Sequence, residues 1–80
     1  MSKLLIVDDD IRLRKLVRTY GEVEHYECDE AADGLAALEK LQNDNFDLVI
    51  LDVMMPGLDG FETLERIRKI SEIPVIMLTA

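Results

Sequence analysis

The sequence has 80 residues, of which 49% are hydrophobic and 32% charged, and its formal net charge is −8 at pH 7. A chain of this length is one small globular domain at most. No apolar run approaches the ~20 residues that a transmembrane helix needs, and nothing marks a signal peptide. The acidic balance argues against direct binding to nucleic acids or anionic membranes. A single cysteine, Cys28, makes a reducing cytoplasm the expected compartment.

The charges are distributed unevenly in the first part of the chain. Residues 11–20 carry four basic side chains and no acidic one, whereas residues 21–30 carry five acidic side chains and no Lys or Arg. Two solvated faces would explain this pattern, and contact between the basic stretch and an acidic partner is the sharper alternative. The candidate residues for such docking are Arg12, Lys15 and Arg18.

Two kinds of element alternate along the chain. Residues 4–7 form a short continuous apolar run, which predicts a strand buried on both faces. A helix follows with Asp10 as its N-cap, and Gly21 either ends it or costs about 1 kcal/mol inside it. Residues 26–29 predict a second strand, and Asp33 caps a second helix. The apolar stripes expected on these two helices are Leu13, Leu16, Val17 and Tyr20 on the first, and Leu35, Leu38 and Leu41 on the second.

The second half of the chain repeats this pattern. A third strand is expected at 46–51, and proline and glycine make residues 54–57 a loop. Asp59 and Glu62 stand three residues apart, as in a capping box, at the start of a third helix. A proline opens a fourth strand at 75–78. The buried stripe expected on the third helix is Phe61, Leu64 and Ile67. Strands that alternate with helices predict an α/β fold of parallel βαβ units.

Acidic residues follow two of the predicted strands. Asp8 and Asp9 come directly after the first strand, and Asp52 comes directly after the third. Open α/β sheets bind ligands at the carboxyl ends of strands where the strand order reverses, so a strand order of 2-1-3-4 would bring these carboxylates together. Crowded carboxylates raise one another's pKa unless a cation intervenes, and Mg²⁺ suits such a site. Helix capping explains Asp10 but does not explain acids at both strand ends.

The same residues favour phosphoryl transfer. A carboxylate can attack a phosphoryl group to form an aspartyl-phosphate, and a metal ion then neutralises the repulsion between the two anions. Asp52 is the candidate nucleophile because it stands alone at its strand end. Asp8 and Asp9 are candidate metal ligands, and the backbone carbonyl of Met54 is a further one. A dinucleotide fingerprint and a P-loop are excluded because three aspartates occupy the place of the Gly-rich loop. The single histidine, His25, lies in an acidic stretch and is expected at the surface.

Three motifs carry a family resemblance. They are LIVDDD at 5–10, LDVMMPGLDG at 51–60 and PVIMLTA at 74–80. In this order and spacing they resemble the receiver domain of two-component response regulators over the whole chain. The resemblance implies a flavodoxin-like sheet of order 2-1-3-4-5 and a phosphorylation switch. It also implies a phosphoacceptor that assists its own phosphorylation, rather than a turnover enzyme acting on a separate substrate.

The resemblance also implies roles for individual residues. Asp52 resembles the phosphoacceptor, and Asp8 and Asp9 resemble the acidic pair that binds Mg²⁺ beside it. Met54 resembles the residue whose carbonyl oxygen binds the same ion, and Thr79 resembles the switch hydroxyl. The implied phosphoryl donor is a phosphohistidine on a sensor histidine kinase or a phosphotransfer protein.

The sequence departs from the family pattern in its length. A full receiver continues through a fourth helix, a fifth strand and a fifth helix, which is roughly 40 more residues at average element and loop lengths. Residues 1–80 are therefore expected to be an incomplete receiver domain with strand order 2-1-3-4, without the lysine and the aromatic switch residue of the family. The bare edge of the fourth strand is a template for pairing, which predicts a homo-oligomer through this edge.

Three functions remain open from the sequence. The first is a phospho-accepting signalling module. The second is an aspartyl-phosphate enzyme of the haloacid-dehalogenase type, which needs a second aspartate two residues after the nucleophile, where this chain has Met54. The third is a scaffold that oligomerises through the edge of the fourth strand and no longer phosphorylates or signals. Mg²⁺-dependent modification of Asp52 separates the first function from the third.

Overall fold

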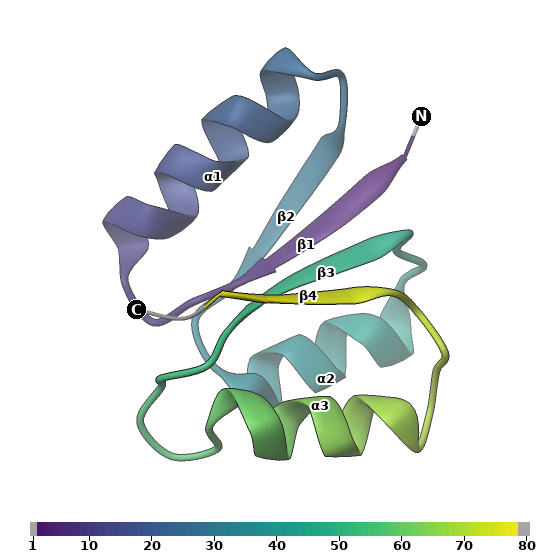
Figure 1. The fold of residues 1–80 in the computed structure, drawn as a ribbon. Helices are drawn as coiled ribbons and strands as arrows, with labels where there is room; N and C mark the ends of the chain where they lie inside the picture. Colours follow the sequence, from purple (N-terminus) through teal and green to yellow (C-terminus); the bar gives the residue numbers. More distant parts are fainter. Residues whose placement is uncertain (1, 79–80) are drawn as a thin grey trace.

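The computed structural model describes residues 2–78 and contains a four-stranded parallel sheet between helices (Figure 1). The strand order is β2-β1-β3-β4, and each neighbouring pair of strands is parallel. The predicted α/β fold and its strand order are confirmed. In chain order the elements are β1 (Lys3–Val7), α1 (Ile11–Val23), β2 (Glu27–Ala31), α2 (Gly34–Asn43), β3 (Leu48–Asp52), α3 (Gly60–Arg68) and β4 (Val75–Leu78).

The helices lie on both faces of the sheet. Figure 1 shows α1 on one face and α2 and α3 together on the other. The side chains of β1 alternate between the two resulting cores: Leu4 and Ile6 pack on the α1 side, and Leu5 and Val7 pack on the side of α2 and α3. All four side chains are buried, which explains why this central strand is a continuous apolar run.

The second and third strands begin and end later than the sequence pattern predicted. β2 begins at Glu27 rather than 26, and β3 begins at Leu48 rather than 46. Pairing with β1 sets these starts, because Lys3 lies opposite Glu27 and Leu4 lies opposite Leu48. The register of a parallel strand depends on its partner, so the local composition alone placed both strands slightly too early in the chain.

On α2 and α3, two large apolar residues that were predicted to be buried lie at the surface. Leu35 is 63% exposed and Phe61 is 62% exposed, so these two predictions were wrong. Each is the second residue of its helix, and the stripe that faces the core begins one residue earlier, at a glycine. The spacing of that stripe is i, i+3, i+4, i+7 in both helices. Its residues are Gly34, Ala37, Leu38 and Leu41 in α2, and Gly60, Thr63, Leu64 and Ile67 in α3.

The first helix shows the same spacing with an unexpected composition. Of its predicted apolar stripe, Val17 packs against the core, whereas Leu13, Leu16 and Tyr20 are exposed, so the prediction was wrong for these three residues. The helix also continues through Gly21 to Val23, so the alternative that this glycine ends the helix is wrong. The residues that α1 turns toward the sheet are Arg14, Val17, Arg18 and Gly21.

Aspartates begin all three helices of the described chain, at the N-cap positions predicted for them. The Oδ1 atom of Asp10 accepts a hydrogen bond from the backbone N–H of Arg12 at 2.9 Å. Asp33 caps α2 in the same manner, and Asp59 forms the predicted capping box with Glu62. No helix within residues 2–78 has the length and apolar content needed to span a lipid bilayer.

Candidate metal and phosphoacceptor site

The candidate site lies at the carboxyl ends of β1 and β3, which are neighbours in the middle of the sheet. After β1 the chain passes into α1 on one face, and after β3 it passes toward α3 on the other face (Figure 1). Such a divergence of connections opens a crevice beside the strand ends. Asp8 and Asp9 follow β1 directly, and Asp52 is the last residue of β3.

The structure brings together the three acidic side chains that the sequence analysis selected. Asp8, Asp9 and Asp52 each offer a carboxylate oxygen, and these oxygens all lie within 4.8 Å of one another. Asp8 is buried, Asp52 is partly buried and Asp9 is exposed. Carboxylate oxygens this close suit a hard divalent cation, because oxygen is the ligand that Mg²⁺ and Ca²⁺ prefer. Within residues 2–78, these three residues form the group that could hold a metal ion.

The environment of Asp8 favours its neutral form. Burial raises the pKa of Asp8 above its ordinary value, and the charges of Asp52, Asp9 and Asp10 raise it further. A hydrogen bond from the Asp10 N–H to the Asp8 Oδ1 atom, at 2.9 Å, partly opposes this rise of the pKa. A bound cation would remove the cost of holding the negative charge at this position.

A cavity of about 480 Å³ opens over the three carboxylates. Its acidic residues lie together at the strand ends, and apolar side chains from α1, β4 and the loop after β3 form the rest of its wall. Such a cavity has space for a hydrated ion and for a phosphoryl group above the carboxylates. Its lining residues are Asp8, Asp9, Asp10, Asp52, Leu13, Val17, Met54 and Leu78.

The other residues considered for the site are Met54, Thr79 and His25, and only Met54 lines the cavity among those that the structure describes. Met54 lines the cavity and is 68% exposed, and its backbone N–H donates to the Asp52 Oδ1 atom at 3.3 Å. That its carbonyl oxygen binds a metal ion stays a prediction. Thr79 lies outside the described residues. His25 is exposed, as predicted, and follows the end of α1 away from the cavity.

Gly60 allows α3 to begin close to the end of β3. The Gly60 N–H donates to the carbonyl oxygen of Val53 at 2.9 Å, and a Cβ atom at residue 60 would collide with the backbone of Asp52 and Val53. Because only glycine lacks a Cβ atom, this position of the motif requires glycine. The close approach holds the loop after Asp52 beside the cavity.

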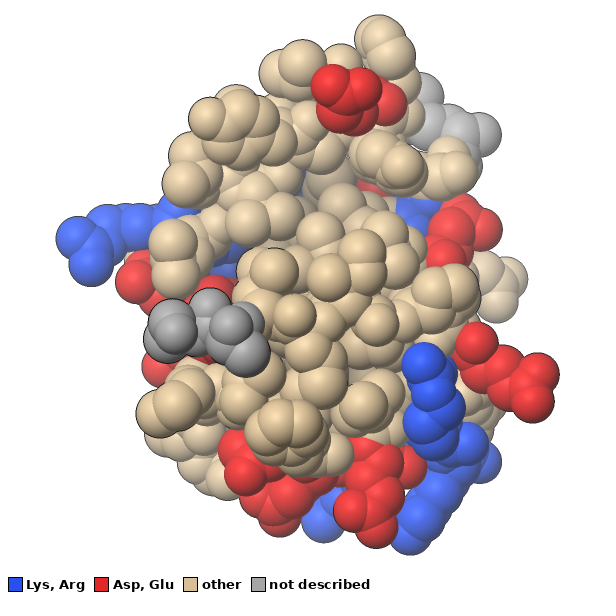
Figure 2. Space-filling model, viewed as in Figure 1, with Lys and Arg blue, Asp and Glu red and all other residues tan. Residues whose placement is uncertain are grey.

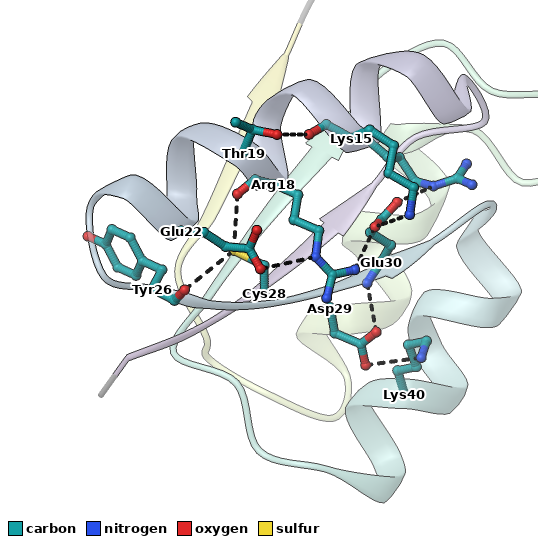
Figure 3. A network of polar contacts seen from close by, with 10 residues as sticks. Lys15, Arg18, Thr19, Glu22, Tyr26, Cys28, Asp29, Glu30 and Lys40 are labelled. Atoms are coloured by element: carbon teal, nitrogen blue, oxygen red, sulfur yellow. Dashed lines mark hydrogen bonds and ion pairs between the residues drawn. The ribbon is translucent and has the colours of Figure 1, made fainter.

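A network of ion pairs that was not predicted from the sequence joins α1 to β2 (Figure 3). Glu30 of β2 accepts hydrogen bonds from Arg14 at 3.1 Å, Lys15 at 2.9 Å and Arg18 at 2.7 Å. Burial raises the pKa of Glu30, but the hydrogen bonds from Arg18, Lys15 and Arg14 outweigh it and lower the pKa to about 2. Arg14 also donates from Nη1 to the backbone oxygen of Asp8 at 2.7 Å, so the network reaches the candidate site.

The basic side chains expected to form a docking surface on α1 also pair with acidic side chains of the same chain, and their docking to a partner stays a prediction. Lys15 and Arg18 bind Glu30 of the same chain, and Arg12 lies 3.6 Å from Asp10. Lys15 and Arg18 thus pair with the acidic stretch that follows them, whereas Arg12 pairs with the aspartate that caps its own helix. The helical spacing places Arg14 and Arg18 on the same face as Val17, but the sequence does not show that this face turns toward the sheet.

Comparisons with known proteins agree on one family. The family model for the response regulator receiver domain matches residues 4–80. Over 80 residues the chain is 58% identical to the transcriptional regulatory protein CpxR homolog of Haemophilus influenzae, covering 100% of this chain and 35% of that protein. It is 49% identical over 79 residues to the transcriptional regulatory protein ResD of Bacillus subtilis, covering 99% of this chain and 33% of that protein. The chain thus spans about a third of the length of these relatives.

Solved structures give the same result. The response regulator TrrA of Thermotoga maritima, in complex with Mg²⁺ and BeF, matches with a TM-score of 0.96 and 43% identity, over 100% of this chain and 70% of that one. The chemotaxis protein CheY4 of Vibrio cholerae matches with a TM-score of 0.92 and 41% identity, over 96% of this chain and 67% of that one. These likenesses confirm the predicted flavodoxin-like receiver fold. The chain belongs to the response regulator receiver domain family, whose members are signalling modules of two-component systems.

Proposed function

We propose that this chain accepts a phosphoryl group on Asp52, with Mg²⁺ held by Asp8, Asp9, Asp52 and the carbonyl oxygen of Met54. The observation that carries the proposal is the convergence of three carboxylates within 4.8 Å at the end of two central strands. The raised pKa of Asp8 supports it as well, because such a site is unfavourable for three anions without a cation. Thr79 is proposed as the switch hydroxyl on the strength of the family motif.

The proposed reaction is a nucleophilic displacement at phosphorus. A carboxylate oxygen of Asp52 attacks the phosphorus atom of a phosphohistidine, a P–O bond forms, and the P–N bond breaks with its electron pair going to the donor imidazole. Bound Mg²⁺ supplies the positive charge that offsets repulsion between the two anions. The Met54 N–H donates a hydrogen bond to the Asp52 carboxylate, which lines the cavity, and so helps to orient it.

The proposed donor is a sensor histidine kinase or a phosphotransfer protein. This proposal is supported by membership of the receiver family. The relatives from Haemophilus influenzae and Bacillus subtilis are both named transcriptional regulatory proteins, which supports a role in the control of transcription. We also propose that residues 1–80 belong to a single receiver domain, because one sheet joins all the strands that the structure describes. That this domain is incomplete stays a prediction.

The proposed function can be tested by intact-mass spectrometry after incubation with Mg²⁺ and a small phosphodonor such as phosphoramidate. The expected result is a phosphoryl adduct in the wild-type protein that disappears with EDTA and is missing in Asp52→Asn. An Asp59→Asn variant is the matched control, because Asp59 caps α3 outside the carboxylate cluster and asparagine keeps the cap. An adduct that survives in Asp52→Asn would rule out Asp52 as the acceptor.

Self-association through β4 is the second candidate. β4 lies at the edge of the described sheet, and Ile76 and Leu78 on this strand are 50% and 41% exposed. On the face seen in Figure 2, uncharged side chains cover the centre of the molecule and most charged side chains lie toward its rim. An edge strand with apolar side chains favours pairing with another strand. Oligomerisation without phosphorylation would support the scaffold function over the signalling function.

A further inference from the structure

We infer that Arg14 is a positioning residue for the metal ligands: it ties the backbone of Asp8 to Glu30 and thereby holds the loop that carries Asp8 and Asp9. The inference rests on the Mg²⁺ site proposed above. It concerns a residue of α1 that does not belong to the carboxylate cluster and would act through the backbone of a ligand.

The contacts of Arg14 connect two separate parts of the fold. Its Nε atom donates to the Glu30 Oε1 atom at 3.1 Å, and its Nη1 atom donates to the Asp8 carbonyl oxygen at 2.7 Å. The side chains of Arg14 and Glu30 are only 13% and 10% exposed, so solvent does not replace these bonds easily. The two bonds use different nitrogens of one rigid planar group, which lysine cannot reproduce with its single nitrogen.

Asp8 is held from three directions. Its backbone N–H donates to the carbonyl oxygen of Ala31 in β2 at 3.2 Å, and its carboxylate accepts from the Asp10 N–H at 2.9 Å. Its backbone oxygen is held by Arg14. Without Arg14, that oxygen loses its anchor to α1 and the peptide unit between Asp8 and Asp9 can rotate. Groups that orient metal ligands in this way commonly change metal affinity about 10- to 100-fold when they are removed.

The charge of Arg14, considered alone, predicts that its removal strengthens Mg²⁺ binding. A positive side chain beside a cation site repels the cation, so its removal would tighten Mg²⁺ binding if electrostatics dominated. Loss of positioning would instead weaken binding. The direction of the change in Arg14→Gln therefore separates the two explanations.

Arg18 provides a matched control within the same network. Its Nη1 atom donates to the Glu30 Oε2 atom at 2.7 Å, and its side-chain bonds go to Glu30 and Glu22 rather than to Asp8. Removal of either arginine weakens the contact between α1 and β2. Only removal of Arg14 also releases the Asp8 backbone.

The test is calorimetric titration of Mg²⁺ at constant ionic strength into the wild-type protein and the variants Arg14→Gln, Arg14→Lys and Arg18→Gln. Urea unfolding in EDTA provides the separate measure of stability. We expect an about 10-fold higher Mg²⁺ dissociation constant for Arg14→Gln, a smaller increase for Arg14→Lys, and a change of less than about twofold for Arg18→Gln. The urea midpoint should fall in both Gln variants.

Each contrary result has a distinct meaning. Wild-type or tighter Mg²⁺ affinity in both Arg14 variants would overturn the inference and leave the proposed site intact. Equal weakening in Arg14→Gln and Arg18→Gln would assign both residues to general stability and would also overturn it. If the wild-type protein binds no Mg²⁺, the proposed site itself is wrong and the inference falls with it.

Discussion

Gly21 of α1 packs against Cys28 of β2 so closely that a Cβ atom at residue 21 would lie 2.8 Å from the Cys28 Sγ atom. The same Cβ atom would lie 3.4 Å from the Cδ2 atom of Leu4. Glycine weakens an isolated helix, yet here it lets the helix approach the sheet. The distance between α1 and β2 also determines whether Arg14 and Arg18 can reach Glu30, so Gly21 contributes to the geometry of the ion-pair network.

Gly21→Ala should therefore destabilise the protein, although alanine is the better helix former. We expect a loss of about 1–2 kcal/mol in the free energy of unfolding, because the strain of overpacking exceeds the gain in helix propensity. Urea denaturation followed by circular dichroism measures it. In a Cys28→Ala background the sulfur atom is absent and the clash is removed. Gly21→Ala should therefore lower the free energy of unfolding less in that background than in the wild-type protein. An increase in stability for the single variant would refute this account of the contact.

Asp8→Asn should stabilise the metal-free protein and abolish its response to Mg²⁺. The raised pKa of Asp8 means that the folded state binds this proton more tightly than the unfolded state, so stability falls as pH rises above 3.8. A neutral asparagine removes that cost and still accepts the Asp10 N–H. Thermal melts in EDTA and in excess Mg²⁺ provide the measurement: Mg²⁺ should raise the melting temperature of the wild-type protein but not of Asp8→Asn. The Asp10→Asn variant should keep the response to Mg²⁺. If Mg²⁺ no longer raised the melting temperature of this variant, the assignment of Asp10 as a helix cap alone would be contradicted.

Glu30→Gln should remove one component of the acid sensitivity of the protein. The pKa of Glu30 is lowered from 4.5 to about 2, so its contribution to stability is fully present above pH 4.5 and is lost as pH falls toward 2. We expect Glu30→Gln to be less stable than wild type by about 2 kcal/mol at pH 7, because the three cations that bind Glu30 lose their shared carboxylate. The difference should shrink below pH 4.5. Glu65→Gln, on the exposed surface of α3, is the control and should leave the free energy of unfolding at pH 7 close to that of the wild-type protein.

Asp59→Ala should destabilise α3 and the loop beside the site. The Asp59 Oδ1 atom accepts the Glu62 N–H at 2.9 Å, and loss of an N-cap typically costs about 1 kcal/mol. Asp59→Asn should cost only a few tenths of that amount because asparagine also caps helices. The measurement is the urea midpoint of the three proteins. Equal midpoints for Asp59→Ala and wild type would show that the capping box contributes nothing to stability.

Ile76→Lys should reduce self-association if β4 forms an interface. Ile76 is 50% exposed on the edge strand, and a lysine there places a charge in any strand-to-strand contact. Sedimentation velocity over a concentration series measures the effect. Leu35→Lys is the control because Leu35 is 63% exposed on α2, on the opposite face of the sheet from α1. If the wild-type protein is monomeric at the highest concentration, the interface through β4 does not exist.

The helices show where sequence reasoning succeeded and where it failed. The N-caps Asp10, Asp33 and Asp59 were predicted correctly, because a cap bonds to backbone only two or three residues away. Leu35 and Phe61 were wrongly placed in the core. Apolar size suggested burial, but the face that packs against the sheet is set by the position of the whole helix, and the small residues one position earlier occupy that face.

In the candidate site too, some residues could be predicted from the sequence and others could not. Asp8, Asp9 and Asp52 could be selected from sequence because each adjoins the end of an apolar strand, and parallel strands place these ends at one edge. The bond from Arg14 to the Asp8 backbone could not be selected in this way. It depends on the distance between α1 and β2, which no local pattern encodes.

The sequence by itself determined the alternation of strands and helices, the helix caps and the acidic strand ends, because each depends on interactions between residues close in the chain. Only the tertiary structure decided the starts of β2 and β3, the inward face of α1 and the pairing of the basic stretch with Glu30. These features depend on contacts between segments that are distant in sequence. These contacts can form only after the sheet has assembled. Without the sheet, the basic and acidic stretches would both be exposed to solvent.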